Sequence, residues 1–137
     1  MKDIIRKFVQ RDAFARNLGI DVSEAADGGA VGTMTLRPEH MNSAGTVHGG
    51  ALYALADAVF AAASNSHGTL AMAIEVSMSY MKTARKGTLR AEATEISINP
   101  KLATYLIPVK DEKGEQVALF KGTVYRKKTG LEELYSD

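Results

Sequence analysis

The chain contains 137 residues with a formal net charge of +1, and 45% of them are hydrophobic. This size and composition predict a single soluble globular domain over residues 1–137, long enough to bury a core. Because acidic and basic residues are interspersed, we expect neither nucleic acid nor a membrane surface as a partner. The absence of cysteine excludes disulfides, thiolate nucleophiles and cysteine-ligated metals.

Charged and apolar residues alternate at the N-terminus, so the apolar core of a signal peptide is missing there. No uncharged apolar run reaches the roughly 18–20 residues that a membrane-spanning helix needs. We therefore expect a cytoplasmic protein.

The first third of the chain predicts a helix followed by a hairpin. Residues 3–17 have the pattern of a short amphipathic helix that ends near Gly19. Strands should follow over 19–26 and 29–36, joined by a turn at Asp27-Gly28-Gly29. Pro38 then opens an irregular loop that runs to Val47.

A single long helix is predicted over about 49–66. One face of it should be buried, because apolar residues recur there at helical spacing: Leu52, Leu55, Ala56, Val59, Phe60 and Ala63. Asp57 is the only charged residue between His48 and Glu75. A solitary carboxylate in an apolar helix is costly unless it is paired, hydrogen-bonded or protonated. Asp57 is therefore either a functional acid or a structural carboxylate bonded to a neighbouring hydroxyl or backbone group.

The second half of the chain predicts four strands, over about 70–82, 88–98, 102–110 and 116–127, and a loose tail over 129–137. Helices do not alternate with strands, so the fold class is α+β rather than parallel α/β. We expect one long helix to cover a face of an antiparallel sheet of five or six strands.

A pattern around the long helix resembles the hot-dog-fold thioesterases of the phenylacetic-acid-degradation (PaaI-like) type. The residues that carry it are Asn42, Gly45, His48-Gly49-Gly50, Leu55-Ala56-Asp57, Ala61 and Asn65. The resemblance implies a hot-dog fold, with a long helix inside a curved antiparallel sheet and two subunits joined sheet edge to sheet edge. It also implies hydrolysis of acyl-CoA to a free acid and coenzyme A, without a metal or bound cofactor.

The resemblance assigns roles to residues of the loop and the helix. The backbone N–H of Gly49 would polarise the thioester carbonyl, as a helix N-terminus can. Asp57 would act as nucleophile or as general base toward water, and Asn42 would orient the reacting group or the water. His48 and Gly50 would lie against the substrate, with the His48 ring stabilising the loop by hydrogen bonding.

The spacing of Gly49 and Asp57 adds a constraint. Eight residues of helix span about 12 Å, whereas a nucleophile must approach within about 3–3.5 Å of the carbon it attacks. If both roles are right, the two groups that serve one thioester come from two chains with antiparallel helices. We therefore expect a homodimer with shared sites, and from the resemblance a dimer of dimers.

Other residues are weaker candidates. Arg85, Lys86 and Lys101 could bind the phosphates of coenzyme A, or simply form a solvated face. Some relatives carry Ser or Thr where Ala61 and Ala73 stand, so Ser64, Ser77 or Asn42 are left as candidates to hold the lytic water. His40 and His67 are expected to be solvated, and the three histidines lack the spacing of a zinc site. The N-terminal helix and the Tyr80-Met81 strand end should shape the acyl pocket.

The sequence thus predicts a thioester hydrolase acting on an aryl or medium-chain acyl-CoA, such as phenylacetyl-CoA. Two alternatives stay open at this point. A hot-dog hydratase or dehydratase would pair a catalytic His with an acid in a different local pattern. A non-catalytic acyl-CoA-binding domain would keep the fold without the chemistry.

Overall fold

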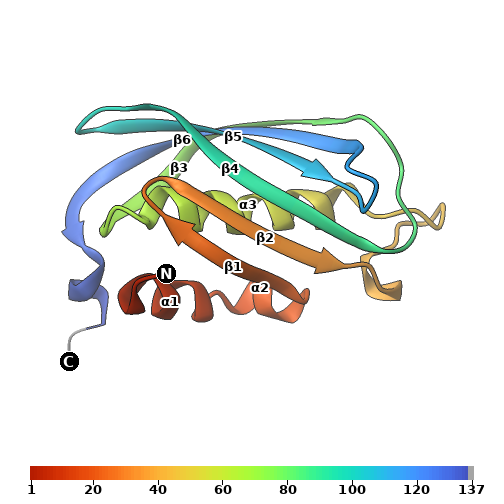
Figure 1. The fold of residues 1–137 in the computed structure, drawn as a ribbon, viewed down its shortest axis with the longest axis horizontal. Helices are drawn as coiled ribbons and strands as arrows, with labels where there is room; N and C mark the ends of the chain where they lie inside the picture. Colours follow the sequence, from red (N-terminus) through yellow and green to blue (C-terminus); the bar gives the residue numbers. More distant parts are fainter. Residues whose placement is uncertain (136–137) are drawn as a thin grey trace.

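A computed structural model describes residues 1–135 of the chain. The elements in chain order are α1 (Asp3–Gln10), α2 (Ala13–Asn17), β1 (Ile20–Ala26), β2 (Gly29–Thr35), the 3-10 helix η1 (Pro38–His40), α3 (Gly49–Asn65), β3 (Thr69–Tyr80), β4 (Thr88–Ile98), β5 (Leu102–Lys110), β6 (Gln116–Gly130) and the 3-10 helix η2 (Leu131–Leu134). The strands form one antiparallel six-stranded sheet in the order β1-β2-β4-β5-β6-β3. Figure 1 shows α3 lying within the curve of this sheet, which confirms the predicted hot-dog architecture.

The core forms where α3 packs on the inner face of the sheet. All six residues of the predicted apolar face are buried there. The Phe60 ring contacts the rings of Phe120 and Tyr105 at centroid distances of 5.2 and 5.8 Å. Gly122 of β6 lets the helix approach closely, since a Cβ atom there would lie 2.7 Å from Cζ of Phe60. Substituting Gly122 would therefore push α3 away from the sheet.

Both ends of the chain differ from the sequence prediction. The N-terminal helix is broken into α1 and α2, because Asp12 accepts a hydrogen bond from the Ala15 N–H at 3.0 Å and caps a new helix. At the other end, β6 continues to Gly130 and the next residue, Leu131, is fully buried. The prediction of a loose tail is therefore wrong for residues 129–134, while residues 136–137 lie outside the described part.

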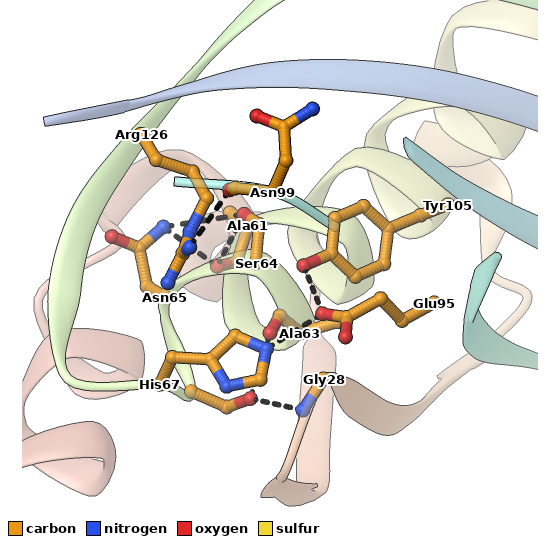
Figure 2. A network of polar contacts seen from close by, with 11 residues as sticks. Gly28, Ala61, Ala63, Ser64, Asn65, His67, Glu95, Asn99, Tyr105 and Arg126 are labelled. Atoms are coloured by element: carbon orange, nitrogen blue, oxygen red, sulfur yellow. Dashed lines mark hydrogen bonds and ion pairs between the residues drawn. The ribbon is translucent and has the colours of Figure 1, made fainter. Parts of the chain in front are cut away.

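A polar network ties the C-terminal end of α3 to the sheet (Figure 2). The Asn65 amide accepts from the Ala71 N–H at 2.9 Å and donates to the Ala71 carbonyl at 3.2 Å. The Glu95 carboxylate lies 2.6 Å from Nε2 of His67 and accepts from the Tyr105 hydroxyl at 2.5 Å. His67 is exposed, as expected, and its ring is also paired with an acid.

Candidate active site

One ridge of α3 is left uncovered by the rest of the chain. The residues of this helix that are not buried are Gly49, Gly50, Tyr53, Asp57 and Ala61. Four of them, Gly49, Tyr53, Asp57 and Ala61, are spaced by four and so follow one another along the helix surface. We call these four the open ridge. It begins at the N-terminus of α3 and carries the only acid of that helix.

The start of α3 offers an unused hydrogen-bond donor. His48 is the N-cap, and its Nδ1 accepts the Gly50 N–H at 2.8 Å. A Cβ atom on Gly50 would lie 2.9 Å from this nitrogen, so a side chain there would displace the cap. The Gly49 N–H, in contrast, has no partner among residues 1–135. It lies at the positive end of the helix dipole, where a carbonyl oxygen that gains negative charge is stabilised.

Tyr80 lies against this helix start. Its hydroxyl donates to the Gly49 carbonyl at 3.2 Å, and a Cβ atom on Gly49 would lie 3.2 Å from its ring carbon Cζ. Tyr80 and Gly49 line a cavity of about 410 Å³ together with Asn42, Leu52 and others. A side chain at position 49 would therefore crowd the Tyr80 ring at the start of the helix.

Asn42 organises the loop that precedes the helix. Its side-chain oxygen accepts from the N–H groups of Ala44 and Thr46 at 2.9 and 3.1 Å, and its Nδ2 donates to the Thr46 hydroxyl at 2.9 Å. His40 connects the same loop to the segment after α2, since its Nε2 lies 2.8 Å from the Leu18 carbonyl oxygen. His40 is only 1% exposed, so the expectation of a solvated ring is wrong.

Asp57 has the properties of a reactive acid. Its carboxylate makes no hydrogen bond or ion pair with any residue in the described range 1–135, so the alternative of a bonded structural carboxylate does not hold for this chain. Burial raises the pKa of Asp57, and the nearby charge of Asp12 raises that pKa further. A carboxylate with a raised pKa is a stronger base, which suits it to proton abstraction.

The sequence pattern that defines the thioesterase superfamily matches residues 44–118, a stretch that includes the whole open ridge. The chain belongs to this superfamily. It is 36% identical over 118 residues to the acyl-coenzyme A thioesterase PaaI of Escherichia coli, covering 85% of this chain and 84% of the relative. It is 46% identical over 127 residues, 92% of this chain and 80% of the relative, to a protein of Archaeoglobus fulgidus whose name proposes an esterase.

The solved structure of the E. coli PaaI protein from the phenylacetic acid degradation operon matches this fold with a TM-score of 0.88 and 32% identity, over 91% of each chain. A mutant form of the phenylacetic acid degradation protein PaaI from Thermus thermophilus matches with a TM-score of 0.81 and 42% identity, over 85% of this chain and 100% of that one. The protein is therefore a hot-dog thioester hydrolase.

Two candidate water-holding serines of this thioesterase lie away from the open ridge. Ser64 is buried and its hydroxyl donates to the Ala61 carbonyl at 3.3 Å. Ser77 pairs with the exposed Lys121, so it lies on the outer face of the sheet. The sequence prediction did not single out Tyr53 as a residue of the open ridge. Its spacing of four residues from both Gly49 and Asp57 could have indicated that it lies between them on the helix surface. The pKa of Tyr53 is raised by burial first and then by Asp57 and Tyr80, which places its ring near both.

The basic residues of the thioesterase do not gather at one place. Arg85 and Lys86 are exposed beside the site, because the preceding residue, Ala84, accepts the Val47 N–H at 2.8 Å. Lys101 lies in the β4–β5 turn, near the opposite end of α3 (Figure 1). Lys82 is already paired with Asp111 at 2.9 Å and with Glu115. Within the described part of one chain, Arg85 and Lys86 are thus the free cations near Gly49.

Residues 1–135 contain neither a candidate metal site nor a candidate membrane span. His, Asp and Glu side chains nowhere cluster in threes as a metal site would require. None of the helices there is both long and apolar enough to cross a membrane.

Proposed function

We propose that this enzyme hydrolyses acyl-CoA thioesters to a free acid and coenzyme A at sites shared between two chains. The observation that carries the proposal is the pair of groups on the open ridge that lack a partner within residues 1–135, the Gly49 N–H and the Asp57 carboxylate. One can stabilise the oxyanion of a thioester, and the other can attack the carbonyl carbon or activate water.

Either role of Asp57 gives a complete reaction. As general base, the carboxylate takes a proton from water while the water oxygen bonds to the carbonyl carbon, and the carbon–sulfur bond then breaks to release the coenzyme A thiolate. As nucleophile, a carboxylate oxygen bonds to the carbon and expels the thiolate, and water then hydrolyses the resulting anhydride. In both routes the Gly49 N–H donates to the carbonyl oxygen as it gains charge.

The length of α3 supports a shared site. Gly49 and Asp57 are eight residues apart on one continuous helix, or about 12 Å. A second chain with its α3 antiparallel would place its Gly49 beside the first chain's Asp57. The edge strand β3 supports this arrangement, since one of its edges is unpaired and the strand carries large exposed apolar residues such as Met72 and Ile74. We propose a homodimer of this kind, assembled further into a dimer of dimers in the cytoplasm.

The substrate is proposed from the cavity beside Gly49 and from the relatives. Coenzyme A would enter past Tyr80, with Arg85 and Lys86 as the cations that meet its phosphates. Asn42 would maintain the loop that presents Gly49. For the acyl part we propose aryl and medium-chain groups, phenylacetyl among them, because the relative PaaI belongs to a phenylacetic acid degradation operon.

A thiol-release assay over a panel of acyl-CoA thioesters tests the proposal. We expect turnover with at least one aryl or medium-chain substrate and none with the matching oxygen esters, since no Ser-His-Asp arrangement is available within residues 1–135. Calorimetry on the same panel is the companion measurement. Saturable binding without thiol release by the wild type would identify a non-catalytic binder and contradict the enzyme.

A further inference from the structure

A second cavity, of about 590 Å³, lies between the N-terminal helices, β1 and α3. This volume is in the range of about 300–1,000 Å³ that small-molecule sites occupy. Its walls are largely apolar and include Phe8, Val9, Ala15, Val22, Ala58 and Ala61. Residues of α1 and α2, such as Phe8 and Ala15, form one wall of this chamber.

One end of the chamber begins beside Asp57. Ala58 follows Asp57 directly, and Ala61 is the next residue of the open ridge, one turn further along α3. Asp12 lines the chamber from the opposite wall, and its charge acts on Asp57. Because the reacting carbon must lie within about 3–3.5 Å of Asp57, a group attached to that carbon has this volume next to it.

Tyr135, which follows η2, also lines the chamber. Its ring lies 4.4 Å from the guanidinium carbon of Arg11 and 5.2 Å from the ammonium nitrogen of Lys7, and it lines the chamber together with Phe8. Two cations on the face of one ring hold it in place against α1.

The charges around the chamber argue against the phosphates of coenzyme A as its occupant. Two arginines, Arg11 and Arg16, are balanced by two aspartates, Asp12 and Asp21. Both cations already have partners, because Arg16 donates to the Gln10 carbonyl at 2.8 Å and Arg11 stacks on Tyr135. An apolar group fits these walls better than an anion does.

We propose that this chamber receives the acyl group of the substrate and that Tyr135 limits the length of the acyl chain. The proposal rests on the proposed function, because it takes the position of the reacting carbon from Asp57. Apolar walls accept aryl and straight-chain acyl groups, and the ring of Tyr135 excludes chains that extend past Phe8.

The test compares Tyr135→Ala, which removes the ring, with Tyr135→Phe, which keeps the ring. We measure kcat/KM for a series from hexanoyl- to tetradecanoyl-CoA. Tyr135→Ala should extend the accepted series to longer chains, and each further methylene that it buries should raise kcat/KM about fourfold. Tyr135→Phe should keep the wild-type profile. Ala61→Phe fills the chamber from the helix side and should shift the preference to shorter chains.

Inert S-alkyl-CoA thioethers of the same lengths separate this proposal from the proposed function, because their binding needs no turnover. Calorimetry should give affinities that rise with chain length and then level off, with the plateau at longer chains in Tyr135→Ala and at shorter chains in Ala61→Phe. Thermal unfolding confirms that each variant is folded. A plateau at the same length in the wild type and in the folded variants would overturn the chamber, whether or not acyl-CoA is hydrolysed. If the affinity plateau shifts in the variants as expected but no acyl-CoA releases its thiol, the proposed hydrolysis is overturned and the acyl chamber is not.

Discussion

At the residue scale, the account depends on Asp57 being an acid without a partner. It is the only charge on an otherwise apolar helix, it is shielded from water, and no described residue bonds to it. A charged group that is removed from water in a folded protein is normally paired or hydrogen-bonded. The presence of Asp57 on the open ridge is consistent with a chemical role.

We predict that Asp57→Asn keeps the fold and loses about 10²- to 10⁴-fold in turnover, which is the usual contribution of a general base. The amide is isosteric with the acid but can neither take a proton nor attack. Asp12→Asn is the comparison, because Asn also caps a helix and should leave α2 intact; it should shift the pH profile of turnover without abolishing turnover. Thiol release by the two variants is compared. A folded Asp57→Asn variant with more than half of the wild-type turnover would remove Asp57 from the mechanism.

The pH dependence follows from the raised pKa of Asp57. The reactive form is the carboxylate, so kcat/KM should increase with pH through a pKa above the ordinary value of aspartic acid. Since the Asp12 charge contributes to this shift, Asp12→Asn should move the profile to lower pH. A profile that is flat from the ordinary aspartate pKa upward would contradict the assignment.

The same shift has a consequence for stability. A carboxyl whose pKa is higher in the folded state binds more protons there than in the unfolded chain, so the free energy of unfolding falls as pH rises from the ordinary value to the raised one. Above that window the ionised Asp57 is fully destabilising. Asp57→Asn should therefore raise Tm at neutral pH, and the gain should disappear below the ordinary aspartate pKa. Equal Tm differences at both pH values would refute this.

At the element scale, the proposed mechanism depends on the N-terminus of α3. The donor in the proposed mechanism is a backbone N–H, so it can be removed only by proline. His48 before it is extended (φ −66°, ψ 135°), as a residue before proline should be, and Gly49 is the first helical residue, where proline is tolerated.

We therefore predict that Gly49→Pro loses about 10²- to 10³-fold in kcat, the usual effect of removing one oxyanion donor. Gly49→Ala is the control, because it adds the same Cβ against Tyr80 but keeps the N–H. The loss of kcat in Gly49→Ala should be clearly smaller than the loss in Gly49→Pro. Circular dichroism and thermal unfolding establish that both variants are folded, and equal losses would show that crowding, not the donor, is responsible.

The opposite end of α3 should matter for stability only. Asn65→Ala leaves both the N–H and the carbonyl of the buried Ala71 without their partner. It should lower the free energy of unfolding by about 1–3 kcal/mol. Ser64→Ala removes two longer bonds, one to the Ala61 carbonyl at 3.3 Å and one from the Asn65 amide at 3.4 Å, and should cost less. Denaturant unfolding of the two variants measures this, and a larger loss in Ser64→Ala would contradict the network.

The elements were predictable where local signals mark them. Turn residues such as Asp27-Gly28-Gly29 and the period of the apolar residues placed the strands and α3 close to their observed bounds. Asp57 could be singled out because it is the only acid of an apolar helix, whereas the role of Gly49 came from the resemblance to the family, and both roles stay predictions. Tyr135 could not be singled out, since its position depends on Lys7 and Arg11, which are far away in the sequence. The extension of β6 was missed for a similar reason, because the Leu131 N–H bonds to the distant Gly68 carbonyl.

At the scale of the whole molecule, the central claim is that each site is shared by two chains. One chain presents a donor at one end of the open ridge and an acid two turns further along it, too far apart for one thioester. Two chains related by a two-fold axis would form two complete sites, one at each end of the paired helices.

The most direct test is to mix Gly49→Pro and Asp57→Asn, each nearly inactive alone, in equal amounts, unfold them and refold them together. If the site is shared, every mixed dimer contains one doubly altered site and one intact site. Half of randomly formed dimers are mixed, so activity should return to about a quarter of the wild-type value. Mass spectrometry confirms that mixed dimers are present. Activity no higher than the mean of the two variants, in a sample that contains mixed dimers, would contradict the shared site.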